Sequence, residues 1–281
     1  MRVNQNGVAA NYPATDPTGG WESEEALDIE MASAICPLCE IVLVEANSNS
    51  STDLFAAEDT AATVCAATVI SNSWDGPEYN TETSDEVHFN HGIPITVASG
   101  DSGFANAGDG YPVSSAYVTA VGGTTLPCPT CVETVWSSIL LMEGSGSDCS
   151  QFIAQPAWQT ALGSSYTSVC NMRIANDVSA VADPGTPVAG YDSYSSGGWT
   201  IFGGTSVATP IIASVYALAG TPGIQDGSYS YSHTGSFHDI TSGSNDIGLG
   251  TVPCGGTFMC TGEVGYDAPS GNGTPNGIGG F

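Results

Sequence analysis

Four short apolar runs constrain the fold of this chain more than any other feature of its sequence. They are rich in β-branched residues, contain no charged side chain, and occupy residues 41–44, 67–70, 93–97 and 117–121. Continuous runs of this length, as opposed to alternating ones, are typical of strands buried on both faces of a parallel sheet. Stretches rich in glycine and polar residues separate them.

Helical periodicity fills the intervals between these runs. Apolar residues at helical spacing predict helices over 23–34, 54–67 and 206–219, and Pro37 and Gly220 follow two of them. Alternating strands and helices favour the α/β class, with a mostly parallel central sheet flanked by helices. The 281 residues suit a single domain spanning 1–281. From residue 223 onward the chain is glycine-rich and aperiodic, so we expect a long loop region that needs an ordering agent.

The charge balance excludes several functions. The chain has two Lys+Arg against 29 Asp+Glu, a net charge of −27. Such a surface repels phosphate backbones and anionic membranes, so neither nucleic acid nor membrane is an expected partner. Two interpretations stay open: general solubility or adaptation to salt, and an acidic working environment in which carboxylates protonate and self-repulsion falls.

Nine cysteines indicate an oxidising, extracellular compartment. Cys65 lies in an apolar run and is expected to be a buried free thiol. The two C-x-x-C pairs could instead bind zinc, although 89 residues separate them and no histidine lies nearby. The expected short-loop disulfides, with the last as a plausible fourth, are Cys36–Cys39, Cys128–Cys131, Cys254–Cys260 and Cys149–Cys170.

The segment G-G-T-S-V-A-T-P at 203–210 is the most informative for chemistry. Two glycines permit a tight turn, and Ser206 then opens an apolar helix whose N-terminus favours developing negative charge. In isolation, Ser206 could equally be a helix cap. The longer G-T-S-x-x-x-P string resembles the nucleophile segment of subtilisin-like peptidases and of their acid relatives, the sedolisins (serine-carboxyl peptidases).

A nucleophilic serine needs a base, and no histidine here stands in a Gly-His-Gly-Thr context. Glu24 and Asp28 are spaced i, i+4, on one face of the predicted helix, where they can share a proton. The run from Gly20 to Glu30 resembles the sedolisin E-x-x-L-D-x-E helix. The resemblance implies that Glu24 is the general base and that Asp28 supports it.

A second loop completes the resemblance. S-G-D-S-G at 99–103 directly follows an apolar run, which places it at the carboxyl end of a strand, where α/β active sites collect. It resembles the sedolisin loop whose aspartate lines the oxyanion hole, so Asp101 takes that role by resemblance. Substrate-binding residues implied in the same way are Ser71, Ser73, Trp74, Ser99 and Gly100.

The irregular tail carries the last element of the resemblance. D-I-T-S-G at 239–243 and G-Y-D at 265–267 are similar to the two halves of the sedolisin calcium site. Carboxylate and carbonyl oxygens suit this hard cation. The implied ligands of one structural Ca²⁺ are Asp239, Ile240, Glu263, Gly265 and Asp267, with Glu263 standing where the family usually has glycine.

The resemblance covers nearly the whole chain and implies a monomeric, secreted peptidase with a subtilisin-like fold that acts on protein or peptide substrates at acidic pH. Sedolisins normally have a pro-region and a central strand before the glutamate helix, whereas only residues 1–20 precede Trp21 here. We therefore expect a gap in the sheet. Two alternatives remain: an inactive, calcium-stabilised binding protein on this fold, and a neutral enzyme that uses His88 or His91 as its base.

Overall fold

The computed structural model describes residues 1–104, 110–194, 196–248, 254 and 256–281. Its α-helices are α1 Gly20–Ile35, α2 Ser51–Thr63, α3 Ala157–Thr160, α4 Ser164–Thr167, α5 Thr205–Ala219 and α6 Ser228–Ser232, and its 3₁₀ turns are η1 Glu82–His88 and η2 Thr234–Ser236. Its strands are β1 Arg2–Asn4, β2 Leu43–Glu45, β3 Ile70–Asn72, β4 Gly76–Pro77, β5 Ile95–Ala98, β6 Ser102–Phe104, β7 Gly110–Tyr111, β8 Thr119–Thr125, β9 Thr134–Val135, β10 Ser137–Ser138, β11 Glu143–Ser147, β12 Cys149–Ala154, β13 Met172–Ile174, β14 Val178–Val181, β15 Val188–Asp192, β16 Gly198–Phe202, β17 Phe237–His238 and β18 Thr274–Pro275.

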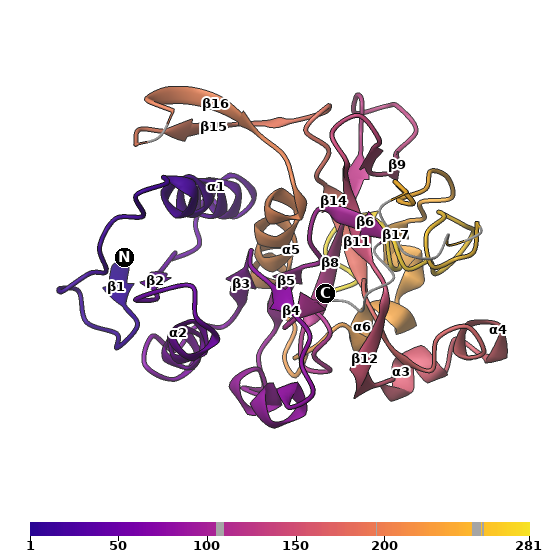
Figure 1. The fold of residues 1–281 in the computed structure, drawn as a ribbon, viewed down its shortest axis with the longest axis horizontal. Coiled ribbons are helices and arrows are strands. Elements are labelled where there is room, and N and C mark those ends of the chain that lie inside the picture. The colour runs from indigo at the N-terminus through magenta and orange to yellow at the C-terminus, as the bar shows by residue number, and fades with distance from the viewer. Residues whose placement is uncertain (105–109, 195, 249–253, 255) are drawn as a thin grey trace.

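A parallel sheet forms the centre of the molecule. Its strands run in the order β14-β8-β5-β3, with β9 added antiparallel beside β8. Strands β1 and β2 form a separate parallel pair beyond β3, and Figure 1 shows this pair standing apart from the rest of the sheet. The predicted α/β class with a mostly parallel sheet is confirmed.

The two faces of the sheet bury different partners. On β5, Ile95 and Val97 belong to a core that includes Phe55 of α2. Thr96 lies between them in sequence, and its hydroxyl donates to the carbonyl of Thr209 in α5 at 3.3 Å. Because successive side chains of a strand point to opposite faces, α2 and α5 cover opposite sides of the sheet. Helix α1 packs on α5 through Leu27, Met31 and Val207.

The predicted elements are all present, with shifted ends. Each predicted apolar run forms a strand that begins two or three residues later than expected, as β2, β3, β5 and β8. Helix α2 begins at Ser51, before its predicted start, because the Ser50 hydroxyl accepts the Asp53 N–H at 3.3 Å. It ends at Thr63, and Ala66 with φ 53° then takes the left-handed conformation that closes it. The tail contains only short elements, as expected, with residues 249–253 and 255 outside the described part.

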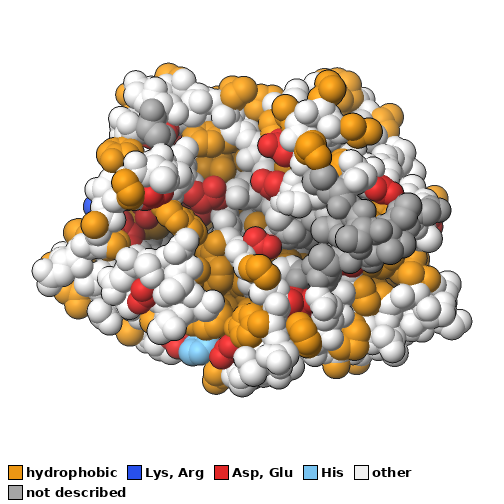
Figure 2. Space-filling model, in the orientation of Figure 1, with side chains coloured by type: hydrophobic (Ala, Val, Ile, Leu, Met, Phe, Trp, Pro, Cys, Tyr) orange, Lys and Arg blue, Asp and Glu red, His pale blue; other side chains and the backbone are white. Residues whose placement is uncertain are grey.

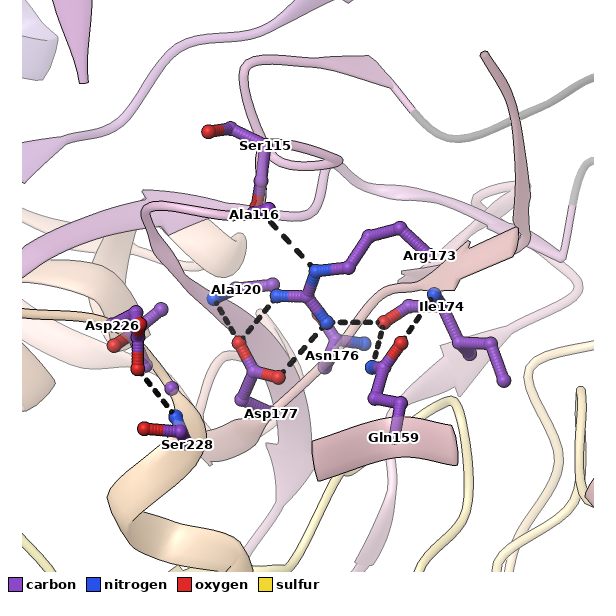
Figure 3. A network of polar contacts seen from close by, with 12 residues as sticks. Ser115, Ala116, Ala120, Gln159, Arg173, Ile174, Asn176, Asp177, Asp226 and Ser228 are labelled. Atoms are coloured by element: carbon purple, nitrogen blue, oxygen red, sulfur yellow. Dashed lines mark hydrogen bonds and ion pairs between the residues drawn. The ribbon is translucent and has the colours of Figure 1, made fainter. Parts of the chain in front are cut away.

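A fully buried ion pair fixes the start of β14 (Figure 3). The guanidinium of Arg173 donates to both carboxyl oxygens of Asp177, at 2.9 and 2.6 Å, and both side chains are inaccessible to solvent. Asp177 also accepts the N–H of Ala120 at 2.8 Å, which ties this pair to β8. Arg173, one of the two basic residues in the sequence, is therefore buried in the protein interior.

The cysteine predictions are confirmed except for one detail. All four expected disulfides are present, which contradicts the zinc interpretation of the C-x-x-C pairs. Cys65 is unpaired in the described structure, but the prediction that it is buried is wrong. It lies beyond the end of α2 and is only half-buried, beside a cavity that Val44 and Ile70 also line. Within the described residues, no helix is both long enough and apolar enough to cross a bilayer.

Candidate active site

Three segments that are far apart in the sequence meet at the carboxyl end of the central sheet. They are α1, the loop between β5 and β6, and the N-terminus of α5. The structure brings together the four predicted catalytic residues, Glu24, Asp28, Asp101 and Ser206, and Figure 2 shows acidic side chains gathered in this central hollow.

Glu24 and Asp28 lie one turn apart on α1, as predicted from their spacing. The Ser73 hydroxyl, just beyond β3, donates to Asp28 Oδ1 at 2.6 Å. Burial raises the pKa of Asp28 well above its usual range, and the charge of Glu24 adds to this increase. Two negative charges one helical turn apart repel each other, which disfavours the ionisation of both carboxyl groups at once.

Ser206 is half-buried in the first turn of α5 and faces this pair. Burial raises the pKa of Glu24, a hydrogen bond from the Ser206 side chain opposes that rise, and the charge of Asp101 adds to it. Burial favours the protonated form of both carboxyl groups, and it does so more strongly for Asp28. The Ser206 and Ser73 side chains partly offset the effect of burial on Glu24, which is the carboxyl group beside Ser206.

Asp101 is fixed to the same helix N-terminus. Its Oδ1 accepts the backbone N–H of Thr205 at 2.8 Å and the Thr205 hydroxyl at 3.0 Å. Although Asp101 is open to solvent on one side, the protein packed around its carboxyl raises its pKa, and the two bonds from Thr205 oppose that rise. Its other oxygen, Oδ2, is then the site that carries the proton when Asp101 is neutral.

Gly204 allows this close approach. Its φ of 101° is a left-handed conformation, and a Cβ at this position would lie 2.6 Å from Asp101 Oδ2. A larger residue would therefore be strained and would displace the carboxyl. The first glycine of the G-G-T-S segment, Gly203, is held equally closely, since a Cβ there would lie 2.5 Å from the ring of Pro184.

Hydrogen bonds with α5 and β11 hold the Asp101 loop in place. The Gly100 N–H donates to Thr205 Oγ1 at 3.1 Å. From β11, Gly144 donates to the carbonyl of Asp101 at 2.9 Å and Gly146 to that of Gly100 at 2.8 Å. The loop is therefore braced from both sides, as a preorganised site for charge stabilisation requires.

The predicted substrate-binding residues lie around this centre in different environments. Ser73 contacts Asp28 and also donates to the Ser206 carbonyl at 3.4 Å. Trp74 packs on Phe55, with ring centroids 6.3 Å apart. Ser71 lies inside β3, and Gly100 is bound to Thr205 as described. The Ser99 hydroxyl is buried without a hydrogen-bond partner among the described residues.

Two contributors were not predicted from the sequence. Thr205 anchors Asp101 through two bonds, yet in the sequence it is simply the residue before the serine. Asp75, beyond β3, lies near the Asp101 loop, and burial followed by the charge of Asp101 raises its pKa to about 6. Thr205 and Asp75 are both distant from Asp101 along the chain. The available sequence signals were the position of Thr205 directly before Ser206 and that of Asp75 just after an apolar run.

The two histidines considered as alternative bases occupy a different place. His88 Nδ1 lies 2.8 Å from Asp59 Oδ2, and His91 Nε2 lies 3.2 Å from Asp59 Oδ1. Both therefore contact a carboxyl group of α2, on the face of the sheet opposite α5. The carboxyl group whose pKa the Ser206 side chain lowers is that of Glu24.

The predicted calcium ligands are brought together in the C-terminal loops. The Gly265 N–H donates to Asp239 Oδ2 at 3.0 Å, and the Glu263 N–H donates to Asp267 Oδ2 at the same distance. The carbonyl oxygen of Ile240 lies so close to Gly262 that a Cβ there would approach it to 2.9 Å. Two carboxylates and adjacent carbonyls form a donor set that fits a hard cation. In the described part of the chain, no three or more His, Cys, Asp or Glu side chains are grouped so that they could hold a metal ion by themselves.

Comparison with known proteins identifies relatives of this arrangement. The Subtilase family model (peptidase S8) matches residues 8–226. Kumamolisin from Bacillus sp. (strain MN-32) is 31% identical over 284 residues, covering 88% of this chain and 50% of its own length. Sedolisin from Pseudomonas sp. (strain 101) is 30% identical over 210 residues, covering 65% and 33%. The chain thus spans half or less of these relatives.

Comparison of the fold with solved structures leads to the same group of peptidases. The solved structure of Pseudomonas sedolisin, a serine-carboxyl proteinase complexed with two molecules of pseudo-iodotyrostatin, superposes with a TM-score of 0.79 at 24% identity, covering 98% of this chain and 81% of that chain. Sphericase superposes with a TM-score of 0.53 at 19% identity. The subtilisin-like fold expected from the sequence, and the resemblance to sedolisins, are confirmed.

Proposed function

This chain belongs to the subtilase family, and from that premise we propose that it is a serine-carboxyl peptidase that hydrolyses peptide bonds at acidic pH. One observation carries the proposal: the side chain of Ser206, in the first turn of α5, lies against the carboxyl group of Glu24 closely enough to lower the pKa of that carboxyl. A carboxylate base is ionised at lower pH than a histidine is neutral, so such a site works in the acid range.

In the proposed first step, Ser206 Oγ attacks the carbonyl carbon of the substrate and transfers its proton to Glu24. Asp28 supports Glu24 by holding the proton that the pair shares, and Ser73 orients Asp28. The electron pair of the carbonyl moves to its oxygen, giving a tetrahedral intermediate. Protonated Asp101 donates a hydrogen bond to that oxyanion, whereas an ionised Asp101 would repel it.

In the second step, the carbon–nitrogen bond breaks and Glu24 gives its proton to the leaving amine. An acyl group then remains on Ser206 Oγ. Water attacks this ester, and Glu24 takes a proton from the water and returns it to Ser206 as the ester bond breaks. The reaction requires ionised Glu24 together with neutral Asp101, so its rate should follow a bell-shaped dependence on pH.

The residues around the site suggest where the substrate lies. We assign Ser73 and Trp74, which follow β3, and Ser99 and Gly100, which follow β5, to binding the peptide backbone. Ser71, within β3, has the same proposed role. Support comes from their common position at the carboxyl ends of adjacent parallel strands. The substrates are proteins or peptides.

We also assign one structural calcium ion to the C-terminal loops. Asp239 and Asp267 would supply carboxylate oxygens, and Ile240, Glu263 and Gly265 would supply carbonyl oxygens. When bound, the ion supplies positive charge that holds two acidic loop segments together. The single domain over 1–281 and an extracellular location are part of the same proposal, the latter supported by four disulfides.

Hydrolysis of a denatured protein tests the function. We expect the chain to cleave an unfolded protein such as denatured casein between about pH 3 and 5. Ser206→Ala should abolish cleavage while the disulfides and the circular dichroism spectrum stay unchanged. Equal cleavage by the two proteins would refute a serine nucleophile. A folded chain that cleaves at no pH would favour the alternative of a non-catalytic binding protein.

A further inference from the structure

The carboxyl group of Glu82 is fully buried, and one of its oxygens has no partner. Glu82 is the first residue of η1 and is 0% exposed. Its Oε2 accepts the backbone N–H of Tyr79 at 2.8 Å. Its Oε1 is buried as well and has no hydrogen-bond partner among the described residues. A buried polar atom without a partner is costly, so this oxygen needs a physical explanation.

Acidic groups surround Glu82. The bond from Tyr79 brings its carboxyl group beside Glu78, and the charges of Glu78 and Glu86 both disfavour its ionisation. In the described part of the chain, no Lys, Arg or His forms an ion pair with any of these three glutamates. The titratable groups of the cluster lie before η1, on η1, on β7 and on β13: Glu78 and Tyr79, Asp85 and Glu86, Tyr111, and Arg173.

These surroundings keep Glu82 protonated. Burial raises its pKa from 4.5 to about 8, and the charge of Glu78 adds to this rise, whereas the N–H of Tyr79 opposes it. A neutral carboxyl group has one O–H donor. Since Oε2 accepts from Tyr79, the proton belongs on Oε1. The oxygen that lacks a partner is then a donor, and the neighbouring Glu78 can accept from it.

Glu78 connects η1 to a strand that is distant in the sequence. Its Oε1 accepts the hydroxyl of Ser150 in β12, and its Oε2 accepts the N–H of Gln151 at 2.9 Å. A carboxyl group offers about four lone-pair sites, so Glu78 can accept from Glu82 while it keeps both of these bonds. Glu82 and Glu78 together therefore join η1 to β12.

We propose that Glu82 and Glu78 form an acid latch, in which protonated Glu82 donates from Oε1 to Glu78 and so holds residues 76–88 against β12. When Glu82 loses this proton to solvent, its carboxylate lies in a buried site between two other acidic side chains. The segment then moves outward until Glu82 is hydrated. The movement reverses when the proton returns.

The acid latch is closed in acid and opens in mildly alkaline solution. Because folding raises the pKa of Glu82, its stabilising contribution is complete below about pH 4.5 and is lost as the pH rises through about 8. Residues 76–88 begin directly after Trp74 and Asp75, and Asp75 lies near the Asp101 loop. Opening therefore disturbs one edge of the candidate active site, in addition to any titration of the catalytic carboxyl groups.

Hydrogen exchange at single amides tests this proposal in the folded chain and requires no catalysis. Protection factors are compared at about pH 6 and pH 9, so that the effect of pH on the intrinsic exchange rate is removed. The amides of Tyr79 and Gln151 bond to the two carboxyl groups of the acid latch, and we expect their protection to fall about tenfold or more at the higher pH. The amide of Asp177, which bonds to the Ala120 carbonyl at 2.8 Å, should keep its protection.

Three variants locate the effect. Glu82→Gln carries an N–H donor and no charge at every pH, so the protection of Tyr79 and Gln151 should persist in alkaline solution. Glu78→Gln keeps an oxygen that can accept from Glu82 and removes one repelling charge, so the loss of protection should move to higher pH. Glu40→Gln, a change at an exposed glutamate, should behave as the wild type does.

Several outcomes overturn the proposal. They are unchanged protection of Tyr79 and Gln151 between the two pH values, an equal loss in the Glu82→Gln and wild-type proteins, and protection that fails to return when the pH is lowered again. A simultaneous loss at Asp177 would indicate global unfolding and would overturn it too. If Glu82→Gln does not fold, a loss that is not shifted in Glu78→Gln overturns the proposal equally.

Discussion

Thr205 donates both its backbone N–H and its hydroxyl to one carboxyl oxygen of Asp101, at 2.8 and 3.0 Å. Thr205 is the first residue of α5, and Ser206 follows it. The acid proposed to stabilise the oxyanion and the proposed nucleophile are therefore positioned by a single turn of helix. Because both donors act on Oδ1, the proton of neutral Asp101 resides on Oδ2.

This geometry predicts how Asp101 limits activity at high pH. Protein packed around the carboxyl raises the pKa of Asp101. As the pH rises through this pKa, the donor becomes a repelling charge and the rate falls. Asp101→Asn carries an N–H donor at every pH, so its activity should persist to higher pH than that of the wild type. Asp101→Ala should lower kcat about 10²- to 10³-fold at pH values below this pKa, where the wild type has its donor.

Profiles of kcat between pH 3 and 8 for the three proteins provide the measurement. If Asp101→Asn loses activity at the same pH as the wild type, Asp101 does not set the upper limb. If Asp101→Ala is as active as the wild type, the residue has no part in the reaction.

Glu58 should make the protein more stable in acid. Burial raises the pKa of this side chain from about 4.5 to about 8. Folding therefore favours the protonated form, which contributes stability below about pH 4.5 and loses that contribution as the pH rises toward 8. Each pKa unit is worth about 1.4 kcal/mol, so we expect a loss of a few kcal/mol in the free energy of unfolding.

The Asn72 amide donates to Glu58 Oε2 at 2.8 Å. Glu58→Gln removes the titration while keeping an oxygen that can accept this bond. Urea unfolding at pH 5 and pH 8 should show a smaller difference in this variant than in the wild type. Glu40→Gln, a change at an exposed glutamate, should leave the difference intact. An equal pH dependence in the Glu58→Gln protein would show that Glu58 does not produce it.

Arg173 should be among the most sensitive positions in the interior. Arg173→Met leaves the carboxylate of Asp177 buried without its cation, a change that typically lowers the free energy of unfolding by about 3–5 kcal/mol. Arg173→Lys keeps the positive charge but loses the bidentate contact with Asp177. Its free energy of unfolding should therefore lie between those of the wild type and Arg173→Met. Thermal and urea unfolding measure this order. A Lys variant less stable than the Met variant would contradict the role assigned to charge.

Calcium should stabilise the C-terminal loops. At a concentration 100 times its Kd, a bound ion raises the free energy of unfolding by about 2.7 kcal/mol. We expect Ca²⁺ to raise the Tm of the wild type and chelation to reverse the change. Asp267→Asn should remove this response, whereas Asp246→Asn, in the same tail but outside the paired loops, should retain it. A Ca²⁺ response that survives in Asp267→Asn would place the ion elsewhere.

The sequence predicted the elements better than their boundaries or their environment. Uninterrupted apolar runs located β2, β3, β5 and β8, because burial on both faces leaves a signal within each run. The ends shifted because local contacts, such as the Ser50 cap of α2, set them. Periodicity also could not show that Cys65 is half-buried, since its exposure depends on the cavity that it lines.

The candidate site divides in the same way. The spacing of Glu24 and Asp28 on one helix face follows from the 3.6-residue period, and family resemblance supplied the link to Asp101 and Ser206. The bonds between Thr205 and Asp101 join residues 104 positions apart. No local sequence pattern encodes such a contact. The position of Asp75 beside the Asp101 loop is likewise not encoded in a local pattern.

Covalent trapping of the nucleophile tests the central claim most directly. A peptide aldehyde or fluorophosphonate should react with the folded chain at about pH 4, in the range where a carboxylate base operates, and peptide mapping by mass spectrometry should place the adduct on Ser206. Glu24→Gln should slow this reaction strongly, and Ser206→Ala should form no adduct. An unlabelled Ser206 in the folded wild-type protein, or equal labelling of the Ser206→Ala variant, would contradict the account.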